Sequence, residues 1–305
     1  MKTFLTLVQR EWLQHRFGWS LLAGVPLVLA MLVLSVGQIS ISDNPADRFG
    51  QAFPAILAAM AIGATAAVLF GILAVTSLIL VSGLARRDHQ DRSIEFWLSL
   101  PTSHTVSLAA PLVTHLLLVP LAAVLVGLAG GWLVSMVLVT RLVGFGAWLA
   151  LPWIDVASAA LALLVRLAAG LPLAVLWAAP LILSQVLCNA YFKRWGLPVL
   201  LLTLALGGFL LDRWLGPGIS ANTLIDVLRH AGQALVATGE VNFQHGDSPQ
   251  QLLEGLRSAP GWALADLGSA LRALGSPLFA GCVALAAALF ALLLDWRRRG
   301  AGAAG

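Results

Sequence analysis

The stretch AILAAMAIGATAAVLFGILAVTSLILVSGL occupies residues 55–84 and contains no charged side chain. A helix needs about 20 mostly apolar residues to cross a bilayer, so this stretch is long enough to do so. The chain of 305 residues is 59% hydrophobic and 10% charged. A soluble domain carries about 25% charged residues. Composition and this long uncharged run together predict an integral membrane protein built of helices.

Further apolar runs of the same kind lie on both sides of 55–84. Membrane spans are predicted at about 20–41, 55–84, 106–140, 159–188, 197–212 and 277–295. The first run is longer than the apolar core of a signal peptide, so we interpret it as a retained span. We therefore predict an all-α integral membrane protein with six transmembrane helices. A single transmembrane domain covers 1–305, with a large extracytoplasmic loop at 213–276. Within this loop the sequence pattern predicts helices at 222–235 and 249–274.

A charged, aromatic segment, ARRDHQDRSIEFWLSLPTSHT, occupies residues 85–105 between two predicted spans. Three arginines and three acidic residues lie within the ten positions 86–95, Phe96 and Trp97 follow them, and Pro101 ends the pattern. Such a segment predicts a short helix that lies along the membrane surface and meets a partner. For a charge run taken alone, a solvated loop is the simpler interpretation.

The run DRSIEFWLSLPTSH, residues 91–104, resembles the coupling segment of permease subunits of type 2 ATP-binding-cassette (ABC) transporters. The resemblance rests on an acidic residue followed by Arg and Ser, an aromatic residue, and then Ser-Leu-Pro and another Ser. The pair Arg10–Glu11 near the start of the chain is also similar to that family. So is the aromatic and basic end of the fourth predicted span, residues 191–195.

The resemblance implies the transmembrane subunit of an ABC exporter, which moves substrate across or within the inner (plasma) membrane. ATP and Mg would bind a separate ATPase subunit, and this chain would hold no cofactor of its own. A second permease copy, giving a homodimer, or a paralogue would complete the transporter. The implied ATPase-coupling residues are Asp91, Arg92, Ser93, Glu95, Phe96, Trp97, Ser99, Leu100 and Pro101. An N-terminal interfacial helix would form an elbow that contains Arg10, Glu11 and Trp12.

Basic residues indicate the orientation of the chain. Eleven of the eighteen Lys and Arg residues lie in the segments 1–19, 85–105, 189–196 and 296–305. Cytoplasmic segments of membrane proteins are enriched in basic residues, so both termini are predicted to be cytoplasmic. The net charge of +4 is accordingly interpreted as a topology signal, with no nucleic-acid partner expected.

The sequence contains no phosphate-binding loop, because neither of its two lysines, Lys2 and Lys193, follows a Gly-x-x-x-x-Gly pattern. We therefore expect no ATP hydrolysis by this chain and do not expect it to be an enzyme. Two other classes stay open, namely a secondary transporter driven by an ion gradient and a membrane assembly protein without transport activity. The first would be expected to show midplane charges and broken helices.

Few polar residues fall inside the predicted spans. For His115 we favour a buried neutral side chain, hydrogen-bonded across helices, over a role in a translocation path or in catalysis. For Arg166 we favour snorkelling to the membrane interface over a functional role. Gly127 and Gly131 match the small-xxx-small pattern of close helix contacts, which leaves open whether they serve a dimer.

Overall fold

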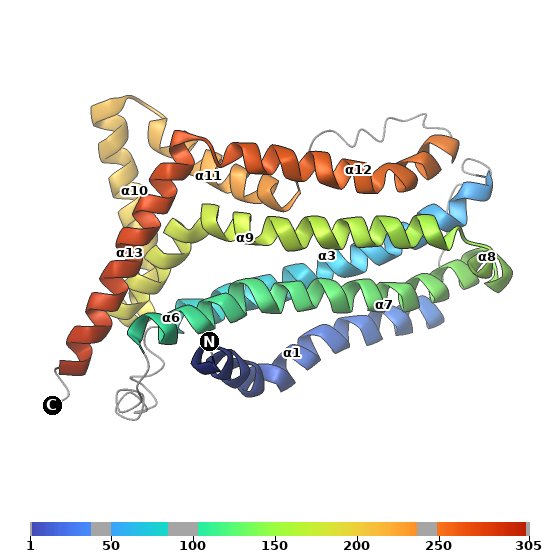
Figure 1. The fold of residues 1–305 in the computed structure, drawn as a ribbon, viewed down its shortest axis with the longest axis horizontal. Coiled ribbons are helices and arrows are strands. Elements are labelled where there is room, and N and C mark those ends of the chain that lie inside the picture. The colour runs from blue at the N-terminus through green and yellow to red at the C-terminus, as the bar shows by residue number, and fades with distance from the viewer. Residues whose placement is uncertain (1, 38–49, 85–102, 237–248, 303–305) are drawn as a thin grey trace.

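The computed structural model describes residues 2–37, 50–84, 103–236 and 249–302 (Figure 1), and all regular elements in these ranges are helical. The elements are α1 (Lys2–Val36), η1 (Gly50–Ala52), α3 (Phe53–Ser82), α6 (His104–Val113), η2 (Thr114–Leu118), α7 (Val119–Leu142), α8 (Phe145–Leu149), α9 (Trp153–Phe192), η3 (Lys193–Trp195), α10 (Gly196–Leu215), α11 (Ile219–Leu235), α12 (Pro249–Ala273) and α13 (Pro277–Gly302). The prediction of an all-α chain is confirmed.

Several helices are long and apolar enough to cross a membrane. Within the described ranges these stretches are Thr3–Val36, Phe53–Ser82, His104–Leu142, Trp153–Trp214 and Pro277–Arg298. The stretch Trp153–Trp214 is 62 residues long and includes two predicted spans, 159–188 and 197–212. The helices therefore fit a membrane protein, whereas the count of six spans stays a prediction. The helix predicted between the second and third spans lies outside the described residues.

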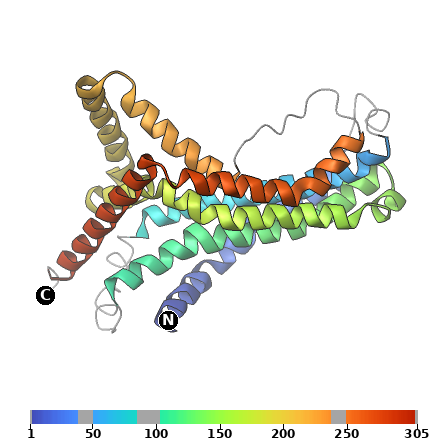
Figure 2. The ribbon, with the colours of Figure 1, turned by 45° about the horizontal axis from the view of Figure 1, so that its top comes forward.

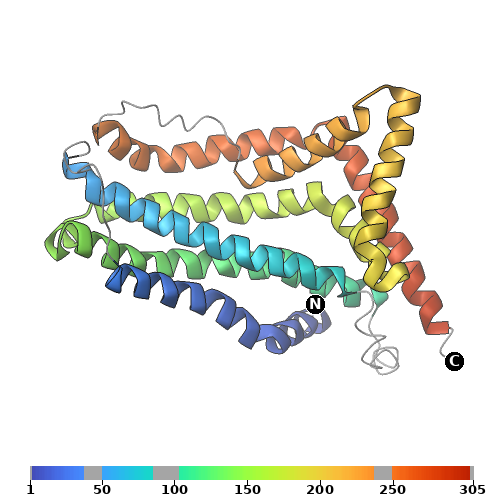
Figure 3. The ribbon, with the colours of Figure 1, turned by 180° about the vertical axis from the view of Figure 1, so that it is seen from behind.

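The chain turns between α9 and α10, although both helices are apolar. The 3-10 turn η3 joins them, and Lys193 at its start has a φ of 57°. A Cβ atom on Gly196 would lie 2.7 Å from the Cα atom of Asn189, so this close approach requires glycine. α10 leaves the turn in a direction different from that of α9 (Figure 3). α9 and α10 are thus two separate helices that are connected by a tight turn.

The first helix is continuous from Lys2 to Val36. The interfacial elbow and the first span, which were expected as separate pieces, therefore form a single helix. It bends in its N-terminal part (Figure 1), and Pro26 lies further along it.

Two glycines bring α7 into close contact with α3. A Cβ atom on Gly127 would lie 2.5 Å from the Cα of Ala66, and one on Gly131 would lie 2.7 Å from the Cα of Ile62. Both glycines are buried. The small-xxx-small pattern is therefore used within this chain, where it lets two backbones approach each other.

Helix ends from distant parts of the sequence meet at one end of the molecule (Figures 1 and 3). Leu84 beyond α3, Leu108 of α6, Ala190 of α9 and Leu293 of α13 belong to one buried core cluster. These residues lie in or close to the segments 85–105, 189–196 and 296–305, whose basic residues indicated a shared side of the membrane. The N-terminus lies near α6 toward the same end (Figure 1).

In the described part of the polar region 213–276, the helices α11 and α12 lie against the long bundle helices. α11 and α12 both pack along α9 (Figure 2). α12 also carries Leu253 and Leu256 to the far end of the bundle, where they contact a cluster that includes Ala58, Val139 and Leu151. The sequence pattern predicted helices in 222–235 and 249–274, and these correspond to α11 and α12.

Candidate functional site

The coupling residues suggested by the family resemblance lie outside the described residues. They are Asp91, Arg92, Ser93, Glu95, Phe96, Trp97, Ser99, Leu100 and Pro101, all within 85–102. The structure describes the flanks of this segment. On its C-terminal side, Ser103 caps α6, because its Oγ accepts a hydrogen bond of 3.3 Å from the Val106 N–H. A helix therefore begins directly after the segment.

The N-terminal flank of the segment is tied to α9. The Asn189 side-chain amide donates a hydrogen bond of 2.9 Å to the Ser82 carbonyl at the end of α3. Val81 and Leu84 pack in the same core cluster as Val186 of α9 and Leu293 of α13. Both flanks of 85–102 are therefore held by one apolar core, into which α3, α6, α9 and α13 all contribute side chains.

The three predicted elbow residues lie on α1 in contrasting environments. The Glu11 side chain is fully buried, and its Oε1 accepts a hydrogen bond of 2.8 Å from the Arg10 guanidinium. Trp12 is 47% exposed, and its ring centroid lies 5.3 Å from that of Trp19. The structure places the Glu11 carboxylate inside the protein, and the role of these residues in an elbow stays a prediction.

His115 meets Glu11 from the opposite helix. It lies in η2, a turn of π-helix between α6 and α7, and its side chain is fully buried. Its Nε2 lies 3.5 Å from the Glu11 Oε2, and neither ring nitrogen has a hydrogen-bond partner among the described residues. The predicted burial of His115 is confirmed, and the predicted hydrogen bond is wrong. Single π-helical turns are frequent at functional sites, so this local irregularity draws attention to the histidine.

His15 completes this group, which we call the Glu–His–His cluster (Glu11, His15 and His115). His15 follows Glu11 by four positions, which places both side chains on one face of α1. Its ring lies 5.5 Å from the His115 ring in an edge-on arrangement. Trp19, one turn further along, contacts His115 at the same ring distance. One ligand atom from each cluster member lies within 4.8 Å of the others, so the three could hold a metal ion.

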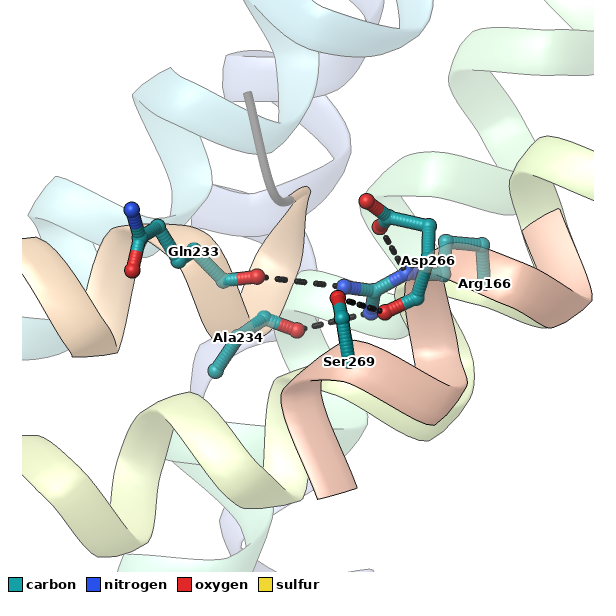
Figure 4. Close-up of polar contacts among 5 residues, drawn as sticks. All are labelled: Arg166, Gln233, Ala234, Asp266 and Ser269. Atoms are coloured by element: carbon teal, nitrogen blue, oxygen red, sulfur yellow. Dashed lines mark hydrogen bonds and ion pairs between the residues drawn. The ribbon is translucent and has the colours of Figure 1, made fainter. Parts of the chain in front are cut away.

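A second buried charge, Arg166, joins three helices (Figure 4). Its Nε donates to the Asp266 carboxylate at 2.5 Å, and its two terminal nitrogens donate to the carbonyls of Ala234 and Gln233 at 2.7 and 3.1 Å. Arg166 belongs to α9, Asp266 to α12, and the two carbonyls to the end of α11. The guanidinium therefore satisfies the last turn of α11 while it pairs with α12.

The interpretation of Arg166 as an interfacial, snorkelling residue is wrong. Its side chain is 0% exposed. Gly170, one turn along α9, makes room for this arrangement, because a Cβ atom there would collide with the Ala234 carbonyl oxygen and the Arg166 guanidinium. The Arg166 contacts hold α11 and α12 against α9 and contribute to the packing of the polar region.

Sequence reasoning singled out Glu11 and His115, but it missed His15 and did not bring the three residues together. The four-residue spacing of Glu11 and His15, which places them on one helix face, was the signal that could have found His15. No local pattern connects either residue to His115, about 100 positions later. Asp266 likewise carries no signal that selects it as the partner of Arg166.

The chain matches no family model, no curated protein and no solved structure.

Proposed function

We propose that this chain is the transmembrane subunit of an ABC exporter, driven by a separate ATPase subunit that binds at residues 91–101. The transporter would move substrate across or within the inner membrane, with both chain termini cytoplasmic and a second permease subunit completing it. The proposal rests on the sequence of the coupling segment. It is supported by several helices that could cross a membrane and by the absence of a phosphate-binding loop.

The packing of the flanks is the structural observation that best supports this proposal. Leu84 and Leu108 stand on either side of the coupling segment and share a buried core with Ala190 and Leu293. Protein interiors are densely packed and transmit displacement. A force applied to the segment would therefore reach α3, α6, α9 and α13 together. A partner ATPase needs such a connection to move several spans at once.

Removal of the Trp97 ring is expected to weaken ATPase binding. Buried aromatic anchors at interfaces contribute about 2 kcal/mol or more, which corresponds to roughly a 30-fold loss of affinity. Trp97→Ala and the charge reversal Glu95→Arg should both reduce co-purification of the ATPase, the latter in a salt-dependent way.

The isolated chain should hydrolyse no ATP, because its sequence contains no phosphate-binding loop.

A suitable control for this experiment is Trp214→Ala. Trp214 is 85% exposed at the end of α10 and does not belong to the coupling segment, so its removal should leave ATPase binding unchanged. All variants are compared at matched membrane levels. Unchanged association and unchanged transport in both Trp97→Ala and Glu95→Arg would contradict the assignment of 91–101 as the docking segment.

Topology provides an independent prediction. A reporter that is active only outside the cytoplasm should be active when fused near Gly246 and silent when fused near Gly300. The physical reason is the basic-residue bias, which places 296–305 inside and leaves 213–276 outside. A reporter that is active only in the cytoplasm should give the reverse pattern. The opposite result at either site would contradict the proposed orientation.

The buried Glu11–His115 contact beside a π-helical turn favours a second candidate, a secondary transporter driven by an ion gradient. Ionisable residues inside membrane helices commonly belong to ion or proton pathways. Reconstituted vesicles separate the two candidates. Transport that requires ATP and the partner subunit supports the ABC exporter, whereas transport driven by an ion gradient in the isolated chain supports the second. A third class, an assembly protein, predicts no transport under either condition.

A further inference from the structure

We propose that Glu11, His15 and His115 bind one divalent transition-metal ion of the zinc class. The inference is independent of the transport direction and of the partner ATPase. Two histidines and one carboxylate form a common protein ligand set for zinc, in which a fourth position remains for water or another ligand. Imidazole nitrogens also select such ions over Mg²⁺ and Ca²⁺, which prefer oxygen ligands.

The distance between the two buried donors fits an ion between them. In a tetrahedral zinc site with metal–ligand distances of about 2.0–2.2 Å, neighbouring ligand atoms lie about 3.4 Å apart. The His115 Nε2 and the Glu11 Oε2 are 3.5 Å apart. They form no hydrogen bond with each other, and both atoms are buried. The separation is too long for a good hydrogen bond and matches one edge of a coordination tetrahedron.

The unsatisfied nitrogens of His115 are the second observation. A buried polar group without a partner costs free energy, and such groups in folded proteins call for an explanation. His115 is 0% exposed, and neither of its ring nitrogens has a hydrogen-bond partner among the described residues. A metal bound at Nε2 would satisfy the nitrogen that faces Glu11.

Neighbouring groups hold the ligands in position. Arg10 donates to the Glu11 Oε1, and the Glu11 Oε2 lies 3.5 Å from the His115 Nε2. Hydrogen bonds of this type to a ligand carboxylate are usual around protein metal sites and fix its orientation. The Trp19 ring packs edge-on against His115 and restricts rotation of the imidazole. His15 is half-buried, which gives the ion access from the protein surface.

A bound ion would join two segments that are far apart in the sequence. Glu11 and His15 belong to α1, and His115 belongs to η2 within the helical stretch His104–Leu142. The ion would fix the first helix against this stretch. Metal binding should therefore stabilise the folded protein, because an ion that binds only the folded state shifts the unfolding equilibrium.

The test uses the purified full-length chain in detergent, stripped with a chelator and titrated with Zn²⁺. We expect one ion per chain, a raised Tm with Zn²⁺, and, with Co²⁺ as a probe, the strong visible absorption of a four-coordinate site. His15→Gln should weaken binding by more than the about 10–100-fold that loss of an outer-shell group costs. Glu11→Gln should act in the same direction.

The matched control is His104→Gln, a histidine on α6 outside the cluster, which should bind Zn²⁺ as the wild type does. His15 is half-buried, so His15→Gln tests the site even if substitution of the buried Glu11 prevents folding. A wild-type chain that binds no Zn²⁺ would overturn the proposal. So would a wild-type Co²⁺ complex without four-coordinate absorption, or a folded His15→Gln variant that binds Zn²⁺ with wild-type affinity.

Discussion

Replacement of Asp266 by alanine is expected to lower the free energy of unfolding by about 3–5 kcal/mol. Asp266 accepts the hydrogen bond from the Arg166 Nε at 2.5 Å, and the arginine side chain is fully buried. Without Asp266, the buried positive charge of Arg166 would lose the carboxylate with which it pairs in the described part of the chain. The remaining contacts to the carbonyls of Ala234 and Gln233 are dipolar and do not neutralise the charge.

An exposed ion pair elsewhere in the same region supplies the control. In α11, a terminal guanidinium nitrogen of Arg229 lies 2.7 Å from the Oδ1 of Asp226. The side chains of Asp226 and Arg229 are 40% and 57% exposed. Asp226→Ala should cost at most about 1 kcal/mol, because solvent screens exposed pairs. Denaturation in mixed micelles, followed by intrinsic tryptophan fluorescence, measures both variants. Equal destabilisation by the two substitutions would contradict the structural role of the buried pair.

A double substitution tests the cause of the Asp266 effect. In Arg166→Met combined with Asp266→Leu, the charge and its partner are both removed. Replacement of a buried ion pair by apolar residues of similar size is often neutral or even stabilising. The double variant should therefore be more stable than Asp266→Ala alone. A double variant that is at least as unstable as the single one would indicate that packing, and not charge, dominates at this position.

Addition of a single methyl group at Gly127 is expected to destabilise the protein by about 1–3 kcal/mol or more. A Cβ atom there would lie 2.5 Å from the Cα of Ala66 on α3, a backbone atom that no side-chain rotation can move. α3 and α7 would have to separate, which disrupts contacts along both helices. Gly127→Ala should therefore lower the Tm and the yield of folded protein.

The control for Gly127→Ala is Gly63→Ala, for which the expected change in stability is zero or positive. Gly63 lies within α3, and a Cβ atom there would have no heavy atom within 4 Å. Alanine is a better helix former than glycine by up to about 1 kcal/mol, so Gly63→Ala should be neutral or stabilising. Thermal unfolding of the two variants side by side measures the difference. A Gly127→Ala variant as stable as Gly63→Ala would contradict the close α3–α7 contact.

Local signals in the sequence were sufficient to predict the class and most of the helices. Apolar composition predicted the membrane helices, and the span expected at 55–84 corresponds to α3, Phe53–Ser82. The patterned stretch 249–274 corresponds to α12, Pro249–Ala273. These predictions succeeded because hydrophobicity and helical periodicity are properties of consecutive residues. The length of an apolar run also shows directly whether a helix can cross a bilayer.

The continuity of helices was less predictable. The elbow expected before the first span is part of α1, and Arg166, expected at an interface, lies inside the 40-residue helix α9. Charged residues at helix ends usually indicate an interface. Here Arg166 is buried because α11 and α12 cover it, and Glu11 is buried against His115 of η2. Sequence position alone therefore gave the wrong environment for Arg166, and it did not show that Glu11 would be buried.

Only the tertiary structure could reveal which residues meet. Arg166 and Asp266 are 100 positions apart, and the Glu–His–His cluster joins the first helix to His115 in the helical stretch His104–Leu142. In a chain so rich in Ala, Leu and Val, many helix faces are equally apolar, and lipid contacts them as readily as protein does. The sequence determined by itself that these segments are apolar helices. The choice of partners depended on close packing at small residues such as Gly127 and on charges that must find a counterpart inside the protein, which are properties of the folded arrangement.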